Sequence, residues 1–334
     1  MKQRYIVSPV YDWLWILGSP VLALIAGIAV SGTRLTTAPL ALGTEHDTAI
    51  GFFTAILVHA HLVAVGFRSH GNPGIRRQYP FRFFVVPAIL WLAIVVSPWI
   101  AVASTVVATF WDVWHSGAQT FGFARIYERN HGTPPELGRR LDFWANQLLY
   151  AGPILAGAVL MDHVRSFDSF KDIGDALFSS VPAHVEGVRH VLTIAVIAAG
   201  TVFLAFYVFV HVQFARAGYR PSWLKVWIVA STGLVSIYTW GFNSWGQAFL
   251  IMNLFHAVQY LALVWAKEGR RLCERARIAP RLGLGLYLGS VLAYGVAVAA
   301  LDPGRTMLWA ITIVVSLMHF WYDAFVWSVR RAEI

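Results

Sequence analysis

The chain has 334 residues, of which 57% are hydrophobic and only 13% charged, and its mean hydropathy is +0.59. Soluble domains carry about 25% charged residues, so this composition excludes an ordinary soluble protein and indicates a polytopic membrane protein. The net charge of +9 does not indicate nucleic-acid binding, because its placement follows membrane topology, and the single Cys273 excludes an internal disulfide and a CxxC motif.

Ten apolar segments are each long enough for a transmembrane helix. They are residues 12–32, 49–67, 82–98, 100–124, 143–161, 190–214, 223–241, 246–266, 282–300 and 306–328. We therefore predict an all-α fold, a bundle of about ten transmembrane helices that forms a single domain over residues 1–334. The basic start MKQR precedes an apolar stretch long enough to remain as a span, so no cleaved signal peptide is expected.

The positive charges alternate with these segments. With a cytoplasmic N-terminus, 21 of the 26 Lys and Arg residues fall in the cytoplasmic segments 1–11, 68–82, 125–140, 215–225, 267–281 and the tail from 329. Cytoplasmic loops of membrane proteins carry such an excess of positive charge. We therefore expect a multi-pass protein of the bacterial cytoplasmic (inner) membrane with both termini in the cytoplasm.

Two segments lie outside the predicted spans. Within the outer segment 162–188, residues 166–180 place Phe167, Phe170, Ile173 and Leu177 on one face, which predicts a short amphipathic helix on the membrane surface or over the bundle. The basic segment 267–281 is expected to be a cytoplasmic connection that contacts anionic lipid headgroups.

Six of the twelve histidines lie within predicted spans, all of them even-numbered. They are His59 and His61 in the second, His115 in the fourth, His211 in the sixth, His256 in the eighth and His319 in the tenth. Counted from the first cytoplasmic Arg or Lys, His61, His115, His256 and His319 form one layer about 10–17 Å from the cytoplasmic helix ends. A single membrane histidine is commonly a structural hydrogen-bonding group, but four helices that each bring an imidazole to one depth indicate a metal or haem site.

His59 and His61 are two residues apart, so on a regular α-helix their side chains point about 200° away from each other. Either only one of them is a ligand, or the helix is locally distorted. We expect both to lie near the metal.

Polar side chains accompany several of these histidines on the same helix face. They are Asp112 and Gln119 beside His115, Asn253, Gln259 and Tyr260 beside His256, and Asp323 beside His319. A metal-bound histidine usually donates its second ring N–H to a carboxylate or carbonyl, so such neighbours fit a metal site. The amides have an alternative role, because Asn and Gln also hold membrane helices together by hydrogen bonds.

These patterns give a set of candidate site residues. The proposed metal ligands are His59, His61, His115, His256 and His319, with Asp323 as a further candidate. The catalytic candidates are Asp112, Gln119 and Gln259, which support or join the ligands, and Tyr207, a proton or electron relay; His211 is a candidate for cofactor binding. Arg68 and Arg125, closer to the cytoplasm, either receive an acidic headgroup or set the topology.

Imidazole-rich sites suit iron, copper or zinc better than magnesium or calcium. With no cysteine at this depth, an iron–sulfur cluster and a structural zinc site are disfavoured; zinc hydrolysis stays an alternative, although no HExxH motif is present. Mononuclear or dinuclear iron that activates dioxygen in an apolar cavity suits a hydrophobic substrate dissolved in the membrane. We expect an enzyme that hydroxylates, desaturates or oxidatively cleaves a lipid-like substrate, with electrons from a redox donor protein.

This general plan resembles that of the histidine-rich membrane oxygenases, such as the fatty-acid desaturase and hydroxylase superfamily and the bacterial carotenoid-cleaving dioxygenases. The stretches VHAHLVAVGFRSH, WHSGAQTFGFARIY, FHAVQYLALVW and HFWYDAFVW are similar to motifs of bacterial multi-pass membrane proteins. The resemblance in plan implies a metal held by histidines and oxidative chemistry. The HxxxH and HxxHH boxes of the desaturases are absent.

Two other classes of function stay open. The first is electron transfer by a haem held between His256 or His319 and His61 or His115. The second is transport of a metal ion or proton, which would need polar residues through the whole bilayer. The outer halves of the even-numbered segments are apolar, for example IGFFTAIL and TMLWAITIVV, and this favours a closed pocket over a pathway.

Overall fold

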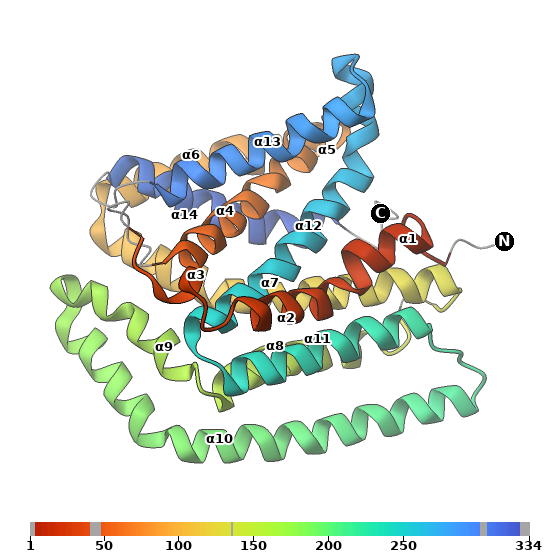
Figure 1. Ribbon diagram of the computed structural model, residues 1–334, viewed down its shortest axis with the longest axis horizontal. Coiled ribbons are helices and arrows are strands. Elements are labelled where there is room, and N and C mark those ends of the chain that lie inside the picture. The colour runs from red at the N-terminus through yellow and green to blue at the C-terminus, as the bar shows by residue number, and fades with distance from the viewer. Residues whose placement is uncertain (1–3, 41–47, 135, 301–305, 328–334) are drawn as a thin grey trace. The chain divides into compact units, whose positions relative to one another are not determined.

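The computed structural model describes residues 4–40, 48–134, 136–300 and 306–327 (Figure 1). Within these ranges every regular element is a helix and no β-strand is present, which confirms the predicted all-α fold. The cytoplasmic tail predicted from residue 329 lies outside the described residues.

Each of the ten predicted apolar segments falls on helical structure. In chain order the elements are α1 (Pro9–Asp12), η1 (Trp13–Leu17), α2 (Ser19–Val30), α3 (Arg34–Thr37), α4 (Ala49–Ser69), α5 (Pro73–Gln78), η2 (Phe81–Val85), α6 (Val86–Val96), α7 (Pro98–His131), α8 (Arg139–Ala156), α9 (Leu160–Arg165), η3 (Ser166–Phe170), α10 (Lys171–Arg216), α11 (Trp223–Phe242), α12 (Trp245–Ala276), α13 (Pro280–Ala299) and α14 (Thr306–Val326).

Several of these helices are long and apolar enough to cross a membrane. Among the described residues there are five: Ala49–Ser69, Leu177–Arg216, Gly246–Ala276, Pro280–Ala299 and Met307–Val326. Two bent pairs, Pro9–Leu17 with Ser19–Val30 (48°) and Arg139–Ala156 with Leu160–Asp168 (83°), raise the number to seven if each pair crosses as one span. The other three predicted spans correspond to the shorter apolar helix Phe81–Val96 and to α7 and α11.

The sharper of the two bends occurs at Gly157, where α8 ends. A Cβ atom at this position would overlap the backbone carbonyl oxygen of Trp240 on α11, so only glycine permits the close approach. The next residue continues the contact, because the Ala158 amide donates to the Gly241 carbonyl oxygen at 3.1 Å. The break in α8 is therefore fixed by a backbone contact with α11.

One connection differs from its prediction, and a second one is largely an extension of a helix. Residues 166–180 do not form a separate amphipathic helix: the chain is non-helical at Gly174 (φ −157°, ψ 62°), and Leu177–Arg216 is one continuous helix. Phe167 is buried whereas Leu177 is 55% exposed, so the predicted apolar face is not buried as a unit. The basic segment 267–281 is mostly helical, because α12 continues to Ala276.

The chain divides into two compact units. The first unit comprises Met1–Leu24 and Asp112–Met252, and the second comprises Ile25–Trp111 and Asn253–Ile334. In the first unit, α8 packs against both α10 and α11. Small residues permit this packing, because Leu148 of α8 lies over Gly200 of α10 and Leu149 lies over Gly233 of α11.

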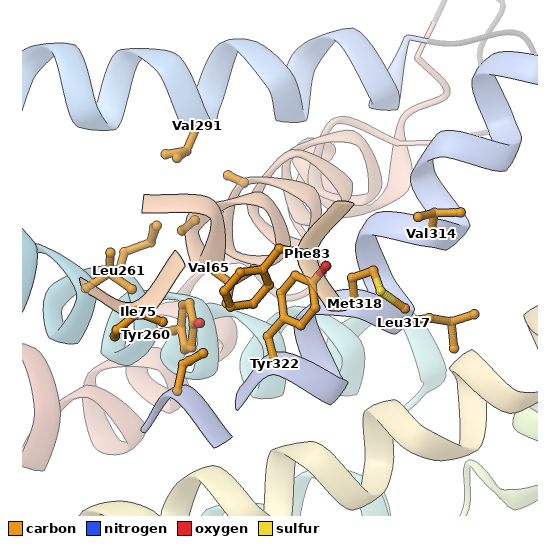
Figure 2. Packing of buried hydrophobic residues seen from close by; sticks show 14 of the residues in the cluster. Val65, Ile75, Phe83, Tyr260, Leu261, Val291, Val314, Leu317, Met318 and Tyr322 are labelled. Carbon is orange, nitrogen blue, oxygen red and sulfur yellow. The ribbon is translucent and has the colours of Figure 1, made fainter. Parts of the chain in front are cut away.

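In the second unit, α13 and α14 pack against α4, and α14 also packs against α6. Buried apolar side chains from these helices, from α12 and from η2 form a single cluster that includes Val65, Phe83 and Val291 (Figure 2). At Gly295 of α13 an added Cβ would meet the backbone carbonyl oxygen of Ile56 on α4. This close packing fixes the orientation of α4 and α14 and therefore the direction of the polar side chains that they bring into the unit.

Candidate metal centre

Three histidine side chains of the second unit come together from three helices. His61 lies on α4, His256 on α12 and His319 on α14, and all three are buried. The ring centroid of His61 lies 4.9 Å from that of His256 and 5.1 Å from that of His319, edge to face in both cases. Imidazoles that bind one ion through nitrogens about 2 Å from it have ring centroids about 5 Å apart, so this spacing suits a shared ion.

The hydrogen bonding of His319 fixes the proton on one ring nitrogen. Its Nδ1 lies 3.0 Å from the carbonyl oxygen of Leu62, and because a carbonyl oxygen can only accept, Nδ1 carries the hydrogen. The neutral ring then has its lone pair on Nε2, which faces Oδ2 of Asp323 at 3.7 Å. A lone pair and a carboxylate oxygen repel each other unless a proton or a metal ion lies between them, and 3.7 Å is too long for a hydrogen bond, so this pair suits a bound metal ion.

His61 is completely buried, yet neither of its ring nitrogens has a hydrogen-bond partner in the part of the chain that the structure describes. A buried polar group without a partner costs about 1–3 kcal/mol. Such a group in a folded protein needs an explanation, and a missing ion is one of the usual ones. The rings beside it are two further imidazoles, which would repel one another if protonated and cooperate if they shared a metal ion.

Asp323 is oriented by two donors on its other oxygen. The Tyr260 hydroxyl donates to Oδ1 at 2.7 Å, and Trp327 Nε1 donates to the same atom at 2.9 Å. These bonds hold Oδ1, and the other oxygen, Oδ2, faces the His319 ring. The ring of Tyr260 also packs on the histidines, 4.6 Å from His319 and 6.1 Å from His61 between centroids.

The polar residues that accompany His256 on α12 are buried as well. Gln259 is completely buried and Asn253 is 7% exposed. The regular spacing of an α-helix places these residues on one face with His256, as the sequence predicts. That Gln259 supports or joins the ligands stays a prediction.

The pair His59 and His61 does not show the local distortion considered above. α4 is a regular α-helix from Ala49 to Ser69, so the two imidazoles leave it about 200° apart. His61 is completely buried whereas His59 is half-buried. The helix geometry therefore supports His61 as a ligand and does not support a shared ion for both.

Three further candidates lie on the part of α7 that belongs to the first unit. His115 is 6% exposed, and Asp112 and Gln119 are half-buried. The face that carries them is therefore mostly buried, as expected for polar groups in an apolar helix. That His115 joins the three histidines of the second unit, with Asp112 and Gln119 in support, stays a prediction.

Tyr207 and His211 belong to a buried group of polar side chains in the first unit. The Tyr207 hydroxyl donates to Asp142 Oδ1 at 2.8 Å, and His211 Nδ1 donates to the Tyr207 carbonyl oxygen at 2.9 Å. His211 Nε2 lies 3.4 Å from both Lys225 Nζ and Asp142 Oδ1. These partners give both residues a structural role, so the contacts do not support Tyr207 as a relay or His211 as a cofactor ligand.

Asp142 is the centre of this group, although it is not among the residues predicted from the sequence. It is completely buried and receives Arg125 Nη1 at 2.7 Å and Lys225 Nζ at 2.9 Å. Glu128, also completely buried, lies 4.0 Å from Lys225 and accepts a hydrogen bond from the Tyr219 hydroxyl. Burial and this carboxylate raise the pKa of the Tyr219 phenol. The sequence signal that could have identified this group is a pair of acidic residues in or next to the arginine-rich segment 125–140, namely Glu128 and Asp142.

Both arginines considered as headgroup receptors are occupied by the protein itself. Arg68 donates from Nη1 to Glu268, and from Nε and Nη2 to the Val326 carbonyl oxygen at 3.3 and 3.2 Å. Arg125 is bound to Asp142 in the first unit. Both guanidinium groups are buried. The headgroup role is therefore replaced by a structural one, in which each arginine ties helices of its own unit together.

No family model, no curated protein and no solved structure matches this chain. Its function is therefore inferred from the side chains themselves. In the second unit these provide three buried imidazoles and one partly buried carboxylate, a donor set that suits a divalent transition-metal ion.

Proposed function

We propose that this protein is a membrane-embedded, iron-dependent oxidoreductase whose metal is bound by His61, His256 and His319, with Asp323 as the fourth ligand. Its substrate is a hydrophobic, lipid-like molecule that is hydroxylated, desaturated or oxidatively cleaved. The observation that carries the proposal is the arrangement of acceptors around one point: Nε2 of His319 faces a carboxylate oxygen, beside a buried His61 without a hydrogen-bond partner among the described residues.

The donor set supports iron. Imidazole and carboxylate donors without thiolate are typical of the non-haem iron sites that activate dioxygen, and copper is the alternative for the same imidazoles. Iron bound there would supply one-electron chemistry with dioxygen. The protein's own contribution is to hold His319 in one tautomer through Leu62, to orient Asp323 and to exclude water by burial.

The ring spacing supports a single ion or a pair of ions rather than a haem. The two axial imidazoles of a haem lie on opposite faces of the macrocycle, so their centroids are more than about 6 Å apart when each nitrogen is about 2 Å from the iron. The histidine rings here are 4.9 and 5.1 Å apart, and the Tyr260 ring packs against them.

A lipid-like substrate fits the surface of the second unit. Apolar side chains of α6 are exposed, for example Ile89, Leu92 and Val96, as expected for a helix that faces lipid. A substrate dissolved in the bilayer would reach the protein from this environment. In this proposal the chain has ten spans and both termini in the cytoplasm of a bacterium, where a redox donor protein delivers electrons.

Metal analysis of the purified protein tests the central claim. We expect iron in the wild type and a strong loss of iron in His61→Ala and His319→Ala, whereas His184→Ala, an exposed histidine of α10, serves as the matched control. His115→Ala shows whether the first unit contributes a ligand. Wild-type iron content in both His61→Ala and His319→Ala would refute the site.

The reaction and the topology need separate measurements. We expect lipid extracts of cells that express the wild type to contain an oxidised product that is absent with His319→Ala. For the topology, single cysteines in a Cys273→Ser background at Arg77 and Arg189 should react with an impermeant reagent from opposite sides of the membrane. Labelling of both from the same side would contradict the ten-span arrangement.

A further inference from the structure

Tyr260 has the environment of a redox-active residue. It is buried beside the proposed ligands, with its ring centroid 4.6 Å from that of His319. Its hydroxyl donates to a carboxylate, Asp323, at 2.7 Å, so a base able to take the phenolic proton is already in contact. A buried tyrosine is hard to oxidise unless its proton can leave with the electron, because the charged radical cation is poorly solvated in a low-dielectric interior.

We propose that Tyr260 is oxidised by one electron during turnover and forms a neutral tyrosyl radical beside the metal site. This inference rests on the proposed function, since the oxidant is the iron site after its reaction with dioxygen or peroxide. The phenolic O–H bond breaks, the proton passes along the hydrogen bond to Asp323 Oδ1, and the electron passes to the iron, which is reduced by one electron. A reductant that later returns one electron, with the proton from Asp323, restores the phenol.

The other two buried tyrosines of this cluster donate their hydroxyl hydrogens to the backbone. Tyr287 and Tyr322 donate to backbone carbonyl oxygens, those of Leu261 and Arg82, both at 3.1 Å. A carbonyl oxygen accepts a hydrogen bond but is far too weak a base to take the proton. Figure 2 shows Tyr260 and Tyr322 in the same packed cluster, so what distinguishes them is the hydroxyl partner and not burial.

Trp327 positions the pair. Its Nε1 donates to Asp323 Oδ1 at 2.9 Å and lies 3.4 Å from the Tyr260 hydroxyl oxygen, and its ring lies under the Arg68 guanidinium at 4.7 Å. Removal of this N–H leaves the bond from Tyr260 to Asp323 in place. Trp327→Phe is therefore expected to keep the radical signal. Tyr260→Phe is expected to lose it, because this variant lacks the phenolic hydroxyl that donates to Asp323.

The experiment uses the full-length protein loaded with ferrous iron, mixed with hydrogen peroxide, frozen at set times and examined by electron paramagnetic resonance. We expect a free-radical signal in the wild type that narrows when the protein is labelled with ring-deuterated tyrosine. The signal, expressed per bound iron, should be lost in Tyr260→Phe and retained in the matched control Tyr287→Phe. Protein without iron should give no signal.

The outcomes separate the two proposals. If the wild type binds no iron, the proposed function fails before this test begins. If it binds iron but gives no radical, or gives one that ring-deuterated tyrosine leaves unchanged, or one that persists in Tyr260→Phe, the role of Tyr260 is refuted while the metal site stands. Should Tyr260→Phe fail to bind iron, Tyr287→Phe and Tyr322→Phe together carry the test: both should keep the iron and the signal, and loss of the signal in either variant with its iron retained would refute the role of Tyr260.

Discussion

Replacement of Asp142 by asparagine should destabilise the first unit strongly. The carboxylate lies 2.7 Å from Arg125 Nη1 and 2.9 Å from Lys225 Nζ, and all three side chains are at most 4% exposed. At an effective dielectric constant of about 20, each unit-charge pair at this distance is worth about 6 kcal/mol. Part of this is offset because the carboxylate no longer has to be desolvated, so we expect a net loss of about 3–5 kcal/mol in the free energy of unfolding.

The penalty arises from the cations left behind, and this gives a second variant. With Asp142→Asn, Arg125 and Lys225 face Glu128 alone, so the buried group has one excess positive charge. Lys225→Met in the same chain restores the charge balance and should recover part of the lost stability. Glu186→Gln, which breaks an exposed pair with Arg165, is the matched control and should leave stability unchanged.

Unfolding of the detergent-solubilised variants, followed by tryptophan fluorescence, measures these differences. The expected order of stability is wild type, equal to Glu186→Gln, then the double variant, then Asp142→Asn. An Asp142→Asn protein within about 1 kcal/mol of the wild type, or a double variant less stable than Asp142→Asn, would refute the assignment of Asp142 as the charge that holds these helices together.

Two further predictions concern packing and ionisation. Gly295→Ala should lower the free energy of unfolding by about 1–3 kcal/mol, because the new Cβ would meet the Ile56 carbonyl oxygen. Gly289→Ala, which has open space around it, is the control and should leave stability unchanged. Thermal denaturation compares the two variants, and equal midpoints would contradict the packing. Because burial and Glu128 raise the pKa of Tyr219, this residue should remain protonated at a pH where exposed tyrosines, with a pKa of about 10, have ionised. An NMR titration of labelled tyrosine checks this, and the Tyr219 resonance is identified as the one that is absent from Tyr219→Phe. If that resonance titrates together with those of the exposed tyrosines, the prediction is wrong.

The class of protein and the position of its helices were predictable from the sequence, because both depend on local properties. A run of apolar residues forms a helix in a membrane whatever lies beside it, so all ten predicted segments fall on helices. The failures lie at the ends, where a break at Gly174 and the extension of α12 to Ala276 depend on packing and capping more than on hydropathy. Length and hydropathy alone give five membrane-spanning helices, or seven if each bent pair crosses as one span, and not the ten that were predicted.

At the candidate metal site, the depth of a side chain is predictable from the sequence, whereas the direction in which it points is not. The rise of an α-helix is constant, so counting residues predicts that His61, His256 and His319 lie at one depth. Counting cannot give the rotation of one helix against another, and that rotation brings the rings of His256 and His319 to about 5 Å from the ring of His61 while His59 points elsewhere. It also joins Asp323 to Tyr260, 63 residues away in the chain.

The buried ion pairs show most clearly which contacts the sequence does not predict. Arg68 and Glu268 are 200 residues apart, and nothing local marks either as a partner of the other, so the sequence assigned Arg68 to topology or a headgroup. The packing of α4, α12 and α14 decides that they meet. The sequence alone therefore determined that the chain is helical, with helices long and apolar enough to span a membrane, and it predicted that histidines share one depth. Only the tertiary structure decided which side chains face one another, because contacts across helices depend on which helices pack together and at what rotation.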